Sequence, residues 1–305
     1  MTSTATATES TSKVRDIELW VLRVVWLVLP FTAFPLVTRA LGQGGDALQL
    51  GGTIGLWVIW AAMLIGSMVP RTETLTALRV IAPAGLAAVI AAVISLLDDG
   101  TVDLVLIGGI ISAGAAALIA FHPAVSDAFA DGSSYGDERR FLLSTPGAIM
   151  AGPIQLVWAS IALGATVGPI LLLAERWILG GILTAIGWPL AFFALPVLHR
   201  LSHRWLVFVP AGMVVHDKTA LREPQLFRKE QITELGPAPV DHNFEDLSLG
   251  GLGLALRVAL IETSKIVRNE RGKDVELTDI GGFVVSPNRP GRVVSEAKGR
   301  GFSIG

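Results

Sequence analysis

The fold is decided in residues 177–217, which read WILGGILTAIGWPLAFFALPVLHRLSHRWLVFVPAGMVVHD. Residues 177–198 carry no acidic, lysine or arginine side chain. They are long enough to cross a membrane, because a helix rises about 1.5 Å per residue and the hydrocarbon layer is about 30 Å thick. Arg204 to Val209 and Met213 to Asp217 then read as two strands, and Pro-Ala-Gly at 210–212 has the residues of a turn. The chain is therefore expected to pass directly from a membrane helix to a β hairpin in water.

Five more apolar stretches precede this one, and together they predict a bundle of six transmembrane helices. The six stretches are Leu19 to Thr38, Leu50 to Val69, Val80 to Leu97, Leu104 to Phe121, Pro146 to Ala174 and Trp177 to Leu198. The fifth is long enough to contain a break, and Pro153 and Pro169 are the places for one. Glycines four residues apart, such as Gly164 and Gly168, predict helices that pack closely on one another.

Basic residues are distributed unevenly between these stretches, and short loops rich in Lys and Arg stay in the cytoplasm. Such residues lie near the start of the first stretch, between the second and third, between the fourth and fifth, and after the sixth: Lys13, Arg15, Arg23, Arg71, Arg79, Arg139, Arg140, Arg200 and Arg204. The alternate loops carry Arg39 and Arg176, and the loop with Asp98, Asp99 and Asp103 has no basic residue. Both termini are thus predicted to be cytoplasmic, in a multi-pass protein of the cell membrane.

Composition divides the chain into three parts. Residues 1–17 open with small polar residues and are expected to be a disordered tail, residues 18–199 form the transmembrane domain, and residues 200–305 form a cytoplasmic domain. The last part holds 15 basic and 13 acidic residues, a balance that argues against nucleic acid as a partner. The chain has no cysteine, which excludes disulfides and thiolate metal sites.

The pattern after residue 200 predicts more strands and one helix. Every even residue from Leu252 to Leu260 is apolar, as in a strand with one buried face. Shorter strands are expected at 226–227, 275–278 and 283–285. Asn288 is placed to cap a terminal helix, with Pro290 in its first turn. The fold class is therefore an α-helical transmembrane bundle of about six spans, with a mostly-β C-terminal domain that ends in one helix.

Three segments of this domain resemble bacterial PH-like domains, which are often attached to membrane anchors. WLVFVPAGMVVHD and LFRKEQITELG are similar to their opening strands, and VVSPNRPGRVVSEAKGRG is similar to their closing strand and helix. The part before residue 200 resembles actinobacterial polytopic membrane proteins. The PH-like resemblance implies a module for binding or assembly without catalytic chemistry. Phosphoinositide binding is not implied, because the turn at 210–212 has no basic residue to clamp a phosphate.

Five residues are candidates for interactions. His199 and His203 are four apart and could hold a metal ion with further ligands, but no carboxylate lies near them in sequence, and a favourable contact with the helix C-terminus is the preferred interpretation. Arg139 and Arg140 form either an element that docks on the C-terminal domain or a contact with lipid headgroups. Gln155 is predicted to hydrogen-bond a neighbouring helix.

Two hypotheses for the function remain. The first is a membrane-anchored scaffold or regulatory protein whose C-terminal domain binds a protein partner or mediates self-association, with the lipid bilayer as its other partner. The alternative is a transporter or channel component for a small or lipidic substrate, although no ionisable side chain lies deep within a predicted span. No nucleophile with a base and an orienting group can be assembled from the sequence, so no enzyme activity, cofactor or metal is predicted.

Overall fold

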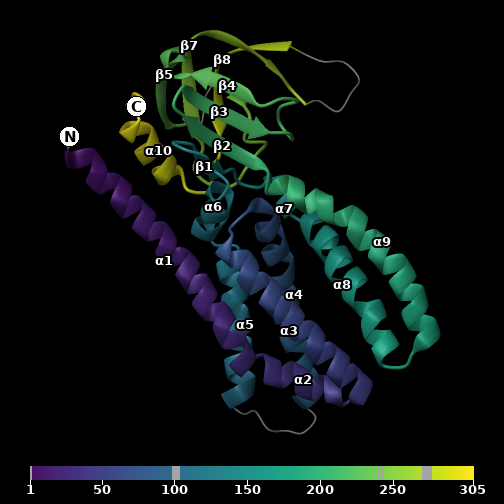
Figure 1. The fold of residues 1–305 in the computed structure, drawn as a ribbon. Coiled ribbons are helices and arrows are strands. Elements are labelled where there is room, and N and C mark those ends of the chain that lie inside the picture. Colours follow the sequence, from purple (N-terminus) through teal and green to yellow (C-terminus); the bar gives the residue numbers. More distant parts are fainter. Residues whose placement is uncertain (1, 98–103, 240, 242, 270–276) are drawn as a thin grey trace. The chain divides into compact units, whose positions relative to one another are not determined.

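The structure is a computed structural model that describes residues 2–97, 104–239, 241, 243–269 and 277–305, with side chains from Ile17 onward (Figure 1). The predicted outer loop with Asp98, Asp99 and Asp103, and residues 275–276 of a predicted strand, lie outside this part. The chain falls into two compact units. The helical unit holds Thr8–Ala128 and Gln155–Leu198, and the β unit consists mainly of Phe129–Ile154 and His199–Gly305.

Long apolar helices make up most of the first two hundred residues. In chain order the helices of this part, long and short, are α1 (Thr2–Thr32), α2 (Phe34–Gly42), α3 (Asp46–Met68), α4 (Thr72–Leu96), α5 (Leu104–Ala120), α6 (Pro123–Asp131), α7 (Gly147–Met150), α8 (Pro153–Leu173) and α9 (Trp177–Leu201). Five spans in the described chain are long and apolar enough to cross a membrane, with α1 and α2 counted together from Ile17. The number rises to six if α5 and α6, bent by 54°, make one span. These helices indicate a multi-pass membrane protein.

Two helix boundaries differ from the prediction. Helix begins at Thr2, where we predicted a disordered tail, because extending an existing helix adds one hydrogen bond for each residue fixed. The fifth predicted span is divided into α7 and α8 just before Pro153, whereas Pro169 lies inside α8 without a break. Proline is favourable in the first turn of a helix, where its missing N–H needs no partner.

Small residues bring α8 and α9 together, as the glycine spacing predicted. A Cβ added to Gly164 would lie 2.6 Å from the carbonyl oxygen of Gly187, and one added to Gly168 would overlap Thr184. Helices in lipid gain from such close backbone approach because lipid tails provide no hydrophobic drive for association. Gly164 and Gly168 are therefore required for this helix pair.

The β unit contains two four-stranded sheets and a terminal helix (Figure 1). Sheet A has the order β1-β2-β3-β4 and sheet B the order β5-β7-β8-β6. The elements are β1 (Arg139–Leu142), β2 (Arg204–Val209), β3 (Gly212–Asp217), β4 (Gln225–Arg228), β5 (Ile232–Pro237), β6 (Glu245–Asp246), β7 (Leu256–Val267), β8 (Leu277–Val285) and α10 (Pro290–Gly299). Large apolar side chains of both sheets, such as Phe208, Phe227 and Phe283, form one core with Val293 and Ala297 of α10.

The predicted hairpin is present, with its turn one residue shorter than expected. Val209 pairs with Gly212, so the turn is Pro210 and Ala211 and the glycine belongs to β3. A Cβ on Gly212 would overlap the carbonyl oxygen of Phe227 in β4, which explains why glycine is needed there. This register places Arg204 opposite Asp217.

Two other predictions were wrong in detail. Leu252 and Leu254 do not belong to a strand, because Gly250 and Gly253 have φ of 67° and 108° and interrupt the extended backbone before β7. Asn288 does not cap α10, because the N-cap position is Arg289, whose side chain makes no capping hydrogen bond. The side-chain oxygen of Asn288 instead accepts a hydrogen bond of 3.1 Å from the hydroxyl of Ser144, which lies in the segment between α6 and α8.

That segment supplies β1 and thereby completes sheet A of the C-terminal part. β1 pairs antiparallel with β2, from Arg139 opposite Phe208 to Leu142 opposite Trp205. The division at residue 199 drawn from the sequence therefore omits a strand of the β unit. The chain passes between the two units after residues 128, 154 and 198. Three chain connections therefore join this part of the β unit to the helices.

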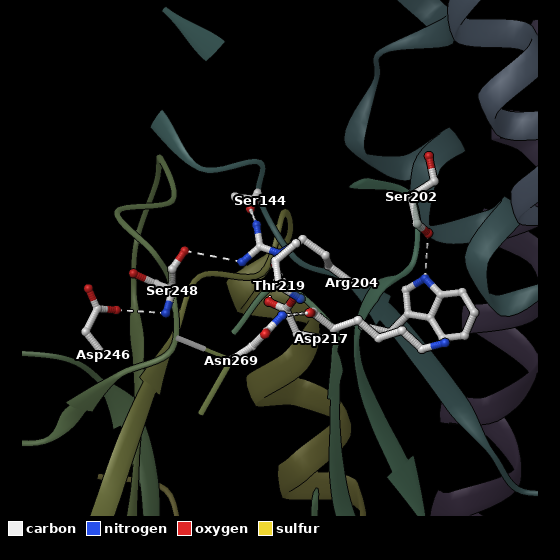
Figure 2. A network of polar contacts seen from close by, with 10 residues as sticks. Ser144, Ser202, Arg204, Asp217, Thr219, Asp246, Ser248 and Asn269 are labelled. Carbon is white, nitrogen blue, oxygen red and sulfur yellow. Dashed lines mark hydrogen bonds and ion pairs between the residues drawn. The ribbon is translucent and has the colours of Figure 1, made fainter. Parts of the chain in front are cut away.

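Arg204 holds this assembly together through a buried network (Figure 2). Its Nε lies 2.7 Å from Oδ2 of Asp217, and the two side chains are 1% and 0% exposed. Its terminal nitrogens donate to the carbonyl oxygens of Ser144, at 2.6 Å, and Ser248, at 3.4 Å. Asp217 also accepts hydrogen bonds from the backbone N–H, at 2.9 Å, and the hydroxyl of Thr219. One guanidinium thus joins the interhelical segment, the first hairpin and the loop before β7.

Replacing Arg204 with alanine should lower the free energy of unfolding of the β unit by about 3–5 kcal/mol, because Asp217 would stay buried without its partner. Pulse proteolysis of the full chain in detergent over a urea series measures the change. Arg257→Ala is the matched control, since it breaks a pair with Glu234 in which the side chains are 25% and 32% exposed. We expect the control to cost about 1 kcal/mol or less. Equal decreases in the free energy of unfolding for both variants would contradict the conclusion that the Arg204 network stabilises the β unit more than an exposed ion pair does.

Candidate functional site: a histidine, tryptophan and arginine cluster

Three of the five sequence candidates meet on one face of sheet A. Here Trp205 of β2 lies opposite His216 of β3 in the antiparallel register, and their ring centroids are 4.9 Å apart. His203, two residues before Trp205, also contacts this indole, and the two ring centroids are 4.9 Å apart. Arg140 reaches over from β1, with its Cζ 4.9 Å from the centroid of Trp205. We call Arg140, His199, His203, Trp205 and His216 the His–Trp cluster.

His199 joins the cluster through a bond to His203. Their Nε2 atoms are 2.9 Å apart, so one ring donates a proton and the other accepts it. The accepting ring must be neutral at that nitrogen. The pair is a hydrogen-bonded contact at the end of α9.

Trp205 fixes the connection between α9 and β2. Its Nε1 donates to the carbonyl oxygen of Ser202 at 2.8 Å, and its ring is nine-tenths buried between His203, His216 and Arg140. A cation over a tryptophan face contributes about 0.5–1 kcal/mol when exposed and about 2 kcal/mol when desolvated. The contact of Arg140 therefore stabilises the attachment of β1 to the hairpin.

The two arginines of β1 have separate carboxylate partners. Arg139 lies 3.0 Å from Oδ2 of Asp131, at the end of α6, and Arg140 lies 3.2 Å from Oε1 of Glu138. Oδ1 of Asp131 also accepts the backbone N–H of Arg140 at 3.1 Å. The two side chains thus hold the start of β1 against the chain that leads into it.

The surroundings of His216 lower the pKa of its ring. Burial lowers its pKa below the usual 6.5, and the positive charges of Lys218 and Arg140 lower it further, while Asp217 acts in the opposite direction. Its Nδ1 is buried and has no hydrogen-bond partner among the described residues. Protonation of this ring would add a second positive charge beside Arg140, which disfavours the charged form.

Gln155 lies outside the cluster, and a residue that the sequence did not single out takes part in helix packing. Gln155 is exposed in the first turn of α8. Arg79 was placed in a loop by the prediction but belongs to the second turn of α4, which begins at Thr72. Its guanidinium donates to the hydroxyl of Ser126 in α6 at 2.8 Å and lies 5.9 Å from the ring centroid of Phe121. This contact links α4 to α6.

The geometry of the cluster suits a structural joint more than chemistry. It combines an indole of β2 stacked on an imidazole of β3, a guanidinium of β1, and a hydrogen-bonded imidazole pair at the end of α9. Comparison with protein-family models, with curated proteins and with solved structures found no match. The function is therefore argued from the geometry of this chain alone.

The pKa of His216 should lie below 6.5 in the folded protein. NMR titration of the protein labelled at histidine Cε1, assigned with His216→Gln, measures it. Because the folded pKa is lower than the unfolded one, the unfolded chain binds more protons, and the β unit should lose stability as the pH falls below about 6.5. A titration at or above 6.5 would show that Arg140 and burial do not act on this ring.

Proposed function

We propose that this chain is a membrane-anchored scaffold or regulatory protein of the cell membrane, in which a PH-like β unit on the cytoplasmic side binds a protein partner or mediates self-association. The observation that carries the proposal is the pairing of β1 with β2. A module that three chain connections join to the membrane part stays at the membrane, which suits a scaffold that recruits a partner there.

The arrangement of the β unit supports a PH-like module. Sheet A is an antiparallel meander of β1 to β4, β5 pairs with β7 and β7 with β8 in antiparallel order, and α10 packs its buried Val293 and Ala297 into the shared core. Two antiparallel sheets followed by one helix is the order that the resemblance implies. Such folds host binding functions on many different surfaces, so the partner itself is not named by the fold.

Strand pairing also supports the predicted topology. β1 precedes α8 and β2 follows α9, and the two strands are hydrogen-bonded neighbours. Both ends of the α8–α9 pair must therefore lie on one side of the membrane, which fits two full crossings. The basic residues on those two segments, Arg139, Arg140, Arg200 and Arg204, favour the cytoplasm for that side.

The transport alternative has less support from the contacts. An ionisable side chain inside a span commonly marks a transport pathway, and Arg79 is one in α4. Its contacts with Ser126 and Phe121 account for it as a link between α4 and α6. We therefore retain the scaffold as the proposed function.

A topology reporter should read cytoplasmic after Gly305 and non-cytoplasmic after Asp99. Alkaline phosphatase fusions at the two positions, checked against a fluorescent protein fused at the same positions, give the measurement. The expected difference follows from the basic segments that flank α8 and α9. Cytoplasmic readings at both positions would overturn the proposed orientation.

Phe141→Asp should abolish specific crosslinks to partner proteins while the helices stay in the membrane. Phe141 of β1 packs on the core, with its ring 5.9 Å from that of Phe208, and a charge there should detach β1. Crosslinking in the native membrane followed by mass spectrometry compares this variant with the unchanged chain.

Gly164→Leu is the control for that experiment, because it separates α8 from α9 without touching the described contacts of the core of the β unit. The scaffold proposal expects partner crosslinks to survive in this control. Crosslinks that persist in Phe141→Asp and vanish in Gly164→Leu would assign the function to the helices instead.

A further inference from the structure

The loop between β6 and β7 exposes two leucines in a segment without charged side chains. Leu252 is 63% exposed and Leu254 is 54% exposed. Residues 247–256 contain no charged side chain. The backbone turns here at Leu249, Gly250 and Gly253, which all have positive φ, so the leucines do not continue the alternation of β7.

This loop lies directly against α7. The N–H of Gly147 donates to the carbonyl oxygen of Gly250 at 3.0 Å, and Pro146 forms a β bridge with Gly251. A Cβ added to Gly147 would lie 3.6 Å from Cδ2 of Leu252, which is an ordinary van der Waals distance. Met150, at the end of α7, is 42% exposed. We call Met150, Leu252 and Leu254 the apolar tip.

Chain length places Met150 of the apolar tip close to the membrane surface. α7 ends at Met150 and the candidate span α8 begins at Pro153. Two intervening residues separate them, and each extended residue covers at most about 3.6 Å, so Met150 lies within about 11 Å of the start of the span. The headgroup region extends roughly 5–8 Å beyond the hydrocarbon on each side. No charged residue occurs between Phe141 and Ala174, so nothing in this segment opposes contact with lipid.

We propose that the apolar tip inserts into the lipid interface beside the start of α8 and holds the β unit on the membrane surface. Leucine is favourable at the boundary of headgroups and acyl chains. Insertion would bring Leu252 and Leu254, from the C-terminal part, to the lipid interface near which α7 is held by its short connection to α8. The proposal depends on α8 being a membrane span and is independent of the scaffold function.

The absence of cysteine from the chain allows a direct test with single labels. Leu252→Cys, labelled with bimane in the full chain and reconstituted in vesicles of brominated phosphatidylcholine, should be quenched by the lipid. The control is Leu277→Cys, because Leu277 is 61% exposed, like the leucines of the loop. It begins β8, whereas Val285 at the other end of this strand pairs with Leu256, where the loop ends. Both positions belong to the β unit and face the same compartment, so vesicle orientation affects them equally.

In the same vesicles a membrane-impermeant maleimide should react with Leu252→Cys about tenfold more slowly than with Leu277→Cys, since only a minor open population exposes an inserted site. Equal rates without quenching would overturn the proposal in favour of a solvated loop. Protection without quenching would overturn it in favour of a protein cover, such as a second copy. Leu254→Cys repeats the test if Leu252→Cys reduces the yield of folded protein.

Discussion

The β unit depends on one constraint, namely that a guanidinium removed from water must find hydrogen-bond acceptors and a countercharge. Arg204 meets this requirement with Asp217 and with two backbone carbonyls, from Ser144 and Ser248. These acceptors belong to three segments that are far apart in sequence. Since an unpaired buried charge is costly, displacing any one of these segments removes part of the compensation for burying Arg204. The backbone adds a further tie, because the N–H of Leu143 donates to the carbonyl oxygen of Arg204 at 2.8 Å.

A consequence concerns the order in which the chain can fold. β1 ends at Leu142, and its partner β2 begins at Arg204, after α8 and α9. Sheet A therefore cannot close until both helices have been synthesised. Until then β1 exposes unpaired backbone groups on a short, charged strand, which is a form that resists pairing with other chains. Closing so long a loop carries an entropic cost, and the buried pair at the meeting point of the strands offsets part of it.

Much of this fold could be predicted, and the failures have identifiable physical causes. Long apolar stretches and the hairpin residues gave the helices and the strands β2 and β3, because length and period are local properties. The partners of Arg204 were missed through an error of one residue: a three-residue turn at 210–212 would put Arg204 opposite Lys218, whereas the turn of two residues puts it opposite Asp217. With the shorter turn, the facing pairs Arg204–Asp217 and Trp205–His216 could have been read from the sequence. β1 was beyond such reasoning, because its pairing depends on contacts across more than sixty residues.

The structural role of the His–Trp cluster follows from its position at the end of α9. Only residues 202 and 203 separate α9 from β2. Both are held, Ser202 by the indole of Trp205 and His203 by its bond to His199 and its contact with Trp205. The last turn of α9, from His199, belongs to the same compact unit as β2, and these contacts hold it beside the hairpin. Arg140 rests on the same indole, which brings β1 into the same joint. The sequence candidates Arg140, His199 and His203 thus share one structural role, which is to hold β1, the hairpin and the last turn of α9 together within the β unit.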